Sequence, residues 1–167
     1  MLTGFDVPLI LAASQPIDSI FRSVNTYPHL ASTTIAGTPE TVPDADLVAS
    51  ARVVLDDLYA GELRALHDLY ERREAEGRTS QDVAEVARFA TYGAVDTVFA
   101  DIDEVVPGSI DESDGAVTFS QANDAAAYGV IDEITRRVWL SGGRVLAVRR
   151  DDVPGESSVA AILRYKF

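Results

Sequence analysis

Two short apolar runs near the end of the sequence constrain the fold most strongly. Val145–Val148 and Val159–Leu163 contain no charged side chain, and a charged segment with a Pro154-Gly155 turn joins them. Uninterrupted apolar runs of this length are typical of strands buried on both faces of a sheet. The chain is therefore expected to fold around a buried sheet that other elements cover on both sides.

Apolar residues at helical spacing predict three helices between residue 44 and these strands. The longest runs from Asp44 to Glu76, with Gly77 as its C-terminal cap. A second helix is expected to begin at Thr79–Asp82, where an acid follows a hydroxyl residue by three positions, and to end at Gly93. A third helix is predicted over 123–140, with Ala127 on its apolar face.

The N-terminal part predicts a smaller set of elements. Val7–Ala13 is a continuous apolar run and is expected to form a strand buried on both faces. A short amphipathic helix is expected after Pro16, because Ile17, Ile20, Phe21 and Val24 recur at helical spacing. Residues 31–43 contain a glycine and two prolines and are expected to form a loop.

Strands and helices alternate in the second half of the chain. Asp96–Ala100 is expected to form a strand, Asp101–Gly115 an acidic loop and Val117–Phe119 an edge strand. This alternation predicts the α/β class, as a three-layer α/β/α sandwich with a mixed sheet over 79–167. The expected organisation is an N-terminal strand-helix and loop (1–43), a helical arm (44–78) and this domain (79–167).

Composition excludes several classes of function. The chain has 167 residues, a net charge of −13 and no cysteine, so it can form neither disulfides nor thiolate metal sites. The negative charge opposes binding to phosphates, which requires lysine and arginine. No apolar run approaches the roughly 20 residues of a membrane span, and no basic residue precedes Val7–Ala13. We expect a cytoplasmic protein without a membrane partner.

Two sequence blocks carry a resemblance to a known family. Val83–Val98 and Gly142–Tyr165 resemble the third domain of archaeo-eukaryotic class-one peptide-chain release factors and Pelota-like rescue factors, with bacterial release-factor-like proteins as the nearest branch. The resemblance implies a fold similar to that of kink-turn-binding ribosomal proteins. Leu9–Ala12 and the helix after it resemble the end of the family's middle domain, so residues 1–43 are expected to be a remnant of that domain.

The resemblance implies a function without catalysis. The family hydrolyses peptidyl-tRNA with a Gly-Gly-Gln loop, which this sequence lacks; Gly142-Gly143-Arg144 stands between a helix and a strand and is no substitute. We therefore expect a non-enzymatic domain that binds a protein partner, in translation termination or ribosome rescue and near the ribosome. The alternative is a kink-turn-type RNA-binding module, although Thr79–Asp82 lacks the lysine and asparagine that kink-turn-binding ribosomal proteins use there.

Acidic residues supply the only candidates for metal chemistry. Carboxylates on a loop suit Ca²⁺ or Mg²⁺, and the weak candidate ligands are Asp101, Asp103, Asp111 and Asp114. They would support a third reading of the chain, as a divalent-metal-dependent enzyme. The preferred interpretation is that these acids are solvated and bind no metal. The sequence predicts neither a cofactor nor a catalytic residue.

Basic residues near the last two strands are the weak candidates for partner binding. They are Arg144, Arg149, Arg150 and Arg164. Salt bridges to neighbouring acids are the preferred interpretation of these side chains. Trp139 and Tyr165 are expected to pack in the core or at its rim. The apolar N-terminal strand-helix, together with the long helix, also favours a homodimer, because it is too small to bury itself.

Overall fold

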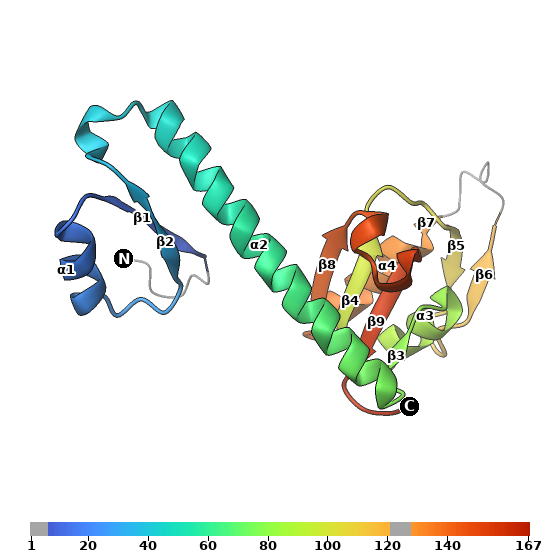
Figure 1. The fold of residues 1–167 in the computed structure, drawn as a ribbon. Helices are drawn as coiled ribbons and strands as arrows, with labels where there is room; N and C mark the ends of the chain where they lie inside the picture. The colour runs from blue at the N-terminus through green and yellow to red at the C-terminus, as the bar shows by residue number, and fades with distance from the viewer. Residues whose placement is uncertain (1–6, 121–127) are drawn as a thin grey trace. The chain divides into compact units, whose positions relative to one another are not determined.

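The chain folds into two compact units, residues 1–64 and 65–167. A computed structural model describes residues 7–120 and 128–167 and is drawn in Figure 1. Helix α2 (Asp44–Ala75) contributes its first part to one unit and its last part to the other.

A strand, a helix and a parallel strand begin the first unit. Strand β1 (Leu9–Ala13) pairs in parallel with β2 (Leu30–Ala36), and helix α1 (Ile17–Val24) connects them. Arg22 ties the helix to the second strand, because its guanidinium donates hydrogen bonds of 3.0 Å to the carbonyls of Ala31 and Ser32. The predicted strand and helix are confirmed.

Two expectations for this unit are wrong. Residues 31–43 were expected to form a loop, but their first part belongs to β2, because pairing with β1 satisfies its backbone groups. Strand β1 is also not buried on both faces, since Leu9 to Ala12 are partly exposed in a sheet of two strands.

Helix α2 has 32 residues and continues through Gly61 without a break. Gly77 ends it with φ of +66°, and the N–H groups of Gly77 and Arg78 donate to the carbonyls of Glu74 and Arg73 at 2.9 Å. This pattern is the Schellman cap that a glycine at this position predicts. No helix among residues 7–120 and 128–167 is long and apolar enough to cross a membrane.

A four-stranded mixed sheet forms the centre of the second unit. Its order is β3 (Thr79–Ser80), β9 (Val159–Leu163), β4 (Val95–Asp101) and β8 (Arg144–Val148). Strand β4 runs parallel to β8 and antiparallel to β9. The two apolar runs near the end of the sequence thus flank β4, and the α/β class is confirmed.

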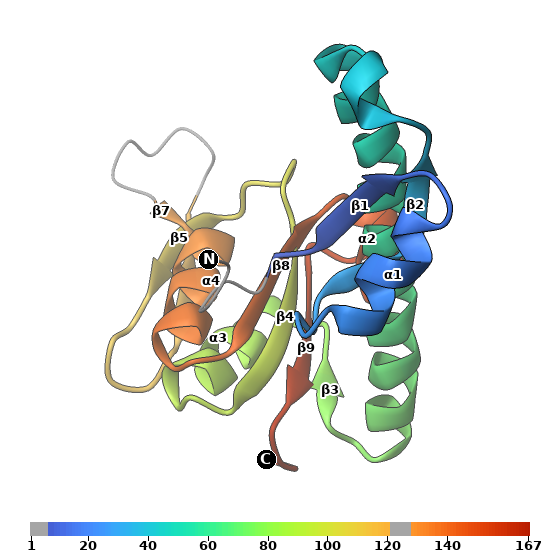
Figure 2. The same ribbon diagram turned by 90° about the vertical axis from the view of Figure 1, so that its left-hand side faces the viewer.

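Helices α3 (Val83–Thr91) and α4 (Val130–Leu140) lie together on one side of β4, β8 and β9 (Figure 2). Phe99 of β4 is directed away from them, and its ring makes edge contacts with His67 and Tyr70 of α2. The core between the two helices and the sheet contains Val86, Ala87, Ala90, Val95, Val98, Ala100, Ile110, Val130, Ile131, Ile134, Val138, Val159, Ala161 and Leu163.

A small second sheet shortens the third predicted helix. Strand β5 (Pro107–Ile110) pairs with β6 (Val117–Phe119) and with β7 (Tyr128–Gly129). Helix α4 therefore begins at Val130 and not at 123, because pairing with β5 holds the two residues before it in extended backbone. Ala127 lies outside the described residues. The segment predicted as an acidic loop contains β5.

The second predicted helix also begins later than expected. Thr79 and Ser80 pair with β9 as a strand, so they cannot be the first residues of a helix. Asp82 is the N-cap instead, and its carboxylate accepts the N–H of Glu85 at 2.9 Å. Three short 3₁₀ turns occupy connections: η1 (Pro39–Thr41), η2 (Arg150–Asp152) and η3 (Pro154–Glu156).

Candidate functional site

Asp101 and Asp103 follow the end of β4. Asp101 is only 5% exposed, and its carboxylate accepts hydrogen bonds of 3.0 Å from the N–H of Asp103 and from Nε of Arg150. The Asp103 N–H contributes most, and Arg150 second, to holding the pKa of Asp101 below its usual value. This carboxylate therefore closes a turn and pairs with an arginine.

Asp111 and Asp114 lie in the turn between β5 and β6. The carboxylate of Asp111 accepts the N–H of Ser113 at 2.8 Å, and that of Asp114 accepts the N–H of Ala116 at 2.9 Å. Within the part of the chain that the structure describes, no three carboxylate or imidazole side chains gather as a metal ion would require. The carboxylates of Asp101, Asp111 and Asp114 thus cap turns, whereas Asp103 takes part through its backbone N–H.

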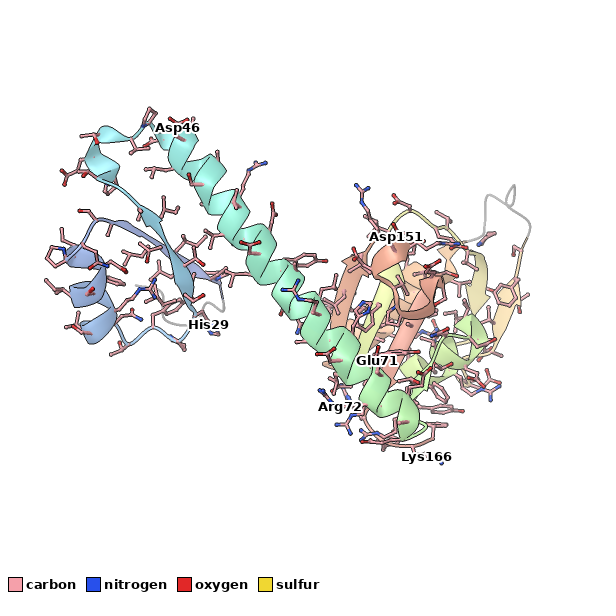
Figure 3. The ribbon with its side chains drawn as sticks, in the orientation of Figure 1. His29, Asp46, Glu71, Arg72, Asp151 and Lys166 are labelled. Atoms are coloured by element: carbon pink, nitrogen blue, oxygen red, sulfur yellow. The ribbon has the colours of Figure 1, made fainter. Side chains whose placement is uncertain are left out.

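The four candidate arginines divide between the two ends of β8. Arg144 begins this strand, whereas Arg149 and Arg150 follow its end. Arg150 pairs with Asp101 and also with Glu104. Arg164 follows β9, and its guanidinium donates to the carbonyl of Ser141 at 2.9 Å. Figure 3 labels Asp151, which follows Arg150, and Lys166, which stands two positions after Arg164. The two labelled residues lie at opposite ends of the second unit.

An aromatic cluster lies at the Lys166 end of this unit. It consists of Phe89 of α3, Tyr92 at the C-cap of that helix, and Tyr165 and Phe167 of the C-terminal segment. Phe167 contacts the other three rings, with centroids 4.9 Å from Phe89, 5.8 Å from Tyr92 and 6.3 Å from Tyr165. Tyr92, Tyr165 and Phe167 remain 51–58% exposed. Exposed aromatic side chains gathered at one place are typical of interaction surfaces.

Hydrogen bonds to and from the backbone hold the C-terminal segment in this position. The N–H of Arg164 donates to the carbonyl of Ala94 at 2.9 Å, and the guanidinium of Arg78 donates to the carbonyl of Leu163 at 2.9 Å and to that of Arg164. These bonds join the segment to the loop after α3 and to the residue that follows the α2 cap. The aromatic cluster is therefore anchored to two helix ends.

A groove connects the aromatic cluster to α4. It has a volume of about 630 Å³, and its walls include Tyr92, Leu140, Ser141 and Arg136. Leu140 is 63% exposed, and its neighbour Trp139 is 71% exposed, so the expectation that Trp139 packs in the core or at its rim is wrong. The groove thus extends from the end of α3 to the end of α4, and charged side chains, Glu112 among them, also line it.

Ion pairs on α4 form the wall of this groove. Glu133 accepts hydrogen bonds of 2.7 Å from Arg136 and Arg137, and these two arginines, Arg136 first, lower its pKa to about 2. Arg137, whose side chain is 10% exposed, also donates to Thr91 Oγ1 at 2.6 Å and to the Asp111 carbonyl at 3.0 Å. One arginine therefore links α4 to α3 and to the β5–β6 turn.

Replacing Glu133 with glutamine is expected to lower the free energy of unfolding by about 1–2 kcal/mol at neutral pH, between the values typical of exposed and buried pairs. The folded-state pKa is below the ordinary 4.5, so this stabilisation is present above pH 4.5 and is lost as the pH falls toward 2. Urea unfolding of both proteins across this range measures it. The exposed Glu71→Gln is the control and should show no such pH-dependent difference.

The aromatic cluster was not predicted from the sequence. Phe89 and Tyr92 are three residues apart at the end of an amphipathic helix, which places them on one face beside the buried residues. Tyr165 and Phe167 are two apart in the segment that follows β9, a spacing that places side chains on one side where the backbone is extended. These spacings indicate each aromatic pair from the sequence, but they do not indicate that the two pairs are in contact.

Comparisons with known proteins address both units. The family model for bacterial archaeo-eukaryotic release factor family 11 matches residues 1–61. No curated protein matches the sequence. The C-terminal domain of a peptide chain release factor from Methanosarcina mazei has 16% identity and a TM-score of 0.53; the match covers 74% of this chain and 94% of that domain.

Two longer proteins have a similar fold. Archaeal Pelota, from a model of ribosome-bound Pelota and ABCE1, has 19% identity and a TM-score of 0.57, with 93% of this chain and 43% of Pelota covered. Dom34 of S. cerevisiae, a translation termination-like factor that interacts with Hbs1, has 16% identity and a TM-score of 0.57, with 96% and 46% covered. The chain spans less than half the length of these two proteins. The resemblance to release factors and Pelota-like proteins is confirmed.

Proposed function

We propose that this chain is the partner-binding part of a bacterial release-factor-like protein that acts in translation termination or ribosome rescue. The observation that carries the proposal is that two different parts of the chain lead to the same group of proteins. The family model matches only residues 1–61, whereas the block resemblances lie in residues 83–165, within the second unit. Agreement between separate segments is stronger support than either match alone.

The proposed role is binding and not catalysis. The sequence contains no Gly-Gly-Gln, the group with which the family hydrolyses peptidyl-tRNA. Gly142 and Gly143 have a structural role: Gly142 has φ of +75° at the end of α4, and a Cβ on Gly143 would lie 2.6 Å from Cγ1 of Val138. The exposed aromatic cluster supplies a surface that a partner protein can cover.

Ribosomes stalled with peptidyl-tRNA on a truncated message provide the test. We expect the purified chain to co-sediment with them at about 150 mM salt, where only close electrostatic contacts persist, and to release no peptide above the buffer background. An unrelated protein of similar size and net charge controls for trapping in the pellet. Sedimentation of the chain alone reports whether it forms the homodimer expected from the sequence.

Each result bears on a separate part of the proposal. Peptide release well above background would overturn the non-catalytic role and indicate a different catalytic loop. Absence of co-sedimentation, with the chain shown to be folded by circular dichroism, would overturn the association with the ribosome.

A further inference from the structure

We propose that strand β1 and helix α1 of the first unit form a weak symmetric dimer with the same elements of a second copy of this chain. The inference goes beyond the proposed function and does not depend on it. Three features carry it: the open edge of β1, an apolar stripe on α1 and the balance of charge around both.

The outer edge of β1 lacks the usual protections against pairing. Within the described part of the chain, β2 is the only strand beside β1. Leu9–Ala13 contains no charged residue and no proline, which commonly protect an edge. Strand β2 is different, because three of its residues stand opposite one residue of β1 between the pairs Leu9–Leu30 and Leu11–Thr34. Such a bulge disfavours further pairing, so β1 has the more accessible edge.

The pairing with β2 shows which backbone groups of β1 face the open edge. The N–H of Leu9 donates to the carbonyl of His29 at 2.8 Å, so the backbone groups of Leu9 are directed toward β2. Because these groups alternate along a strand, those of Ile10 and Ala12 are directed away from β2. Antiparallel pairing of two β1 strands about a two-fold axis therefore sets Ile10 opposite Ala12 of the second copy, and Leu11 opposite Leu11.

Helix α1 exposes its apolar residues and turns its charged residues toward the sheet. Asp18 and Arg22 form an ion pair of 2.7 Å, and both side chains form hydrogen bonds to β2. The apolar stripe consists of Ile17, Ile20 and Val24, which are 58–70% exposed. At 3.6 residues per turn, the apolar stripe is centred roughly 150° from the Asp18–Arg22 pair. It therefore lies on the flank of α1 away from β2.

Pairing of the two β1 strands brings the two apolar stripes together. A two-fold axis perpendicular to the sheet leaves both α1 helices on the same face. Each helix contacts β1 and bonds to β2, so it lies over this pair of strands. Strands are about 4.8 Å apart, which separates the two helix axes by about 10 Å. Helices pack at about 8–10 Å, so each apolar stripe can cover the other.

A second copy fits this surface better than an unrelated strand. Residues 7–24 contain one acid and one base, whereas the whole chain has a net charge of −13. Two copies can therefore approach here without strong local repulsion. A single added strand would leave the apolar stripe exposed, whereas a second copy covers the edge of β1 and the apolar stripe together.

The size of the surface predicts a weak dimer. Each copy supplies the five residues of β1 and the three of the apolar stripe. A standard interface uses roughly 20–30 residues on each side. We therefore expect a dissociation constant of about 10–100 μM.

Sedimentation velocity of the intact chain tests the inference, between about 5 and 300 μM. We expect monomers at the lowest concentration and dimers at the highest. Ile20→Asp should weaken the dimer by about tenfold or more, because it brings two carboxylates together in an apolar contact. Val53→Asp is the matched control, since Val53 is 62% exposed on α2, and it should leave the dissociation constant unchanged.

A disulfide reports the predicted register. The chain has no cysteine, so a single introduced cysteine can bond only to a second copy. In the predicted pairing, the two Cα atoms of Leu11→Cys are about 4.5 Å apart, within the range of a disulfide. Mild oxidation should therefore give covalent dimers of Leu11→Cys. Thr33→Cys, on the exposed part of β2, is the control and should crosslink only by collision.

Circular dichroism of each variant shows whether it remains folded. The inference is overturned if the chain is monomeric at about 300 μM or if Ile20→Asp and Val53→Asp have equal effects. It is also overturned if Leu11→Cys crosslinks no faster than Thr33→Cys. These outcomes are independent of peptide release and ribosome co-sedimentation, which test the proposed function alone.

Discussion

Replacing Phe99 with alanine is expected to lower the free energy of unfolding of the second unit by about 3–5 kcal/mol, the usual loss for a fully buried phenylalanine. Phe99 has no solvent exposure, and its ring contacts His67 and Tyr70 at centroid distances of 5.7 and 6.4 Å. The substitution removes the side chain that packs the last turns of α2 against the sheet. Urea unfolding followed by circular dichroism measures the loss.

Hydrogen exchange adds a local measurement to this prediction. The backbone amides of residues 65–75 should exchange faster in Phe99→Ala than amides in β4 and β9, because the helix loses its contact before the sheet opens. Phe119→Ala is the matched control, since its ring is 57% exposed, and it should change stability by less than about 1 kcal/mol. Equal losses for the two variants would contradict the assignment of Phe99 to the core.

Replacing Gly115 with alanine is expected to lower the free energy of unfolding by about 2–5 kcal/mol, the sum of a positive-φ penalty and overpacking. Gly115 has φ of +76°, and an added Cβ would lie 2.6 Å from Thr91 Oγ1 and 2.7 Å from Cα of Arg88. The backbone of α3 cannot move aside as a flexible side chain would. Thermal melting of the variant measures the effect.

Gly142→Ala is the control that separates the positive-φ penalty from the overpacking. Gly142 has φ of +75°, but an added Cβ would meet nothing within 4 Å, so only the backbone penalty of about 1–2 kcal/mol applies. The difference between the variants therefore reports the close approach of the β5–β6 turn to α3. Equal melting temperatures for the two variants would mean that the turn moves away from the helix without cost.

Elements with a strong local pattern were predicted correctly. Strands β8 and β9 follow from uninterrupted apolar runs, and α2 follows from helical spacing with a glycine after its last turn. In these segments burial and backbone preference favour the same structure, so neighbouring residues alone are sufficient. The sequence also indicated the candidate aspartates and arginines as charged residues. It did not indicate the hydrogen-bond and ion-pair partners of these side chains.

Other features depend on residues far away in the chain. Thr79 and Ser80 form a strand because β9 supplies their hydrogen-bond partners, and α4 begins late because Tyr128 and Gly129 pair with β5. The aromatic cluster depends on tertiary structure in the same way, since β9 brings Tyr165 and Phe167 to the end of α3. Local sequence determined which segments are strands and helices where burial and propensity agree. Only tertiary structure decided the weaker element boundaries and the assembly of the aromatic cluster, because pairing and packing energies there exceed local preferences of a few tenths of a kcal/mol per residue.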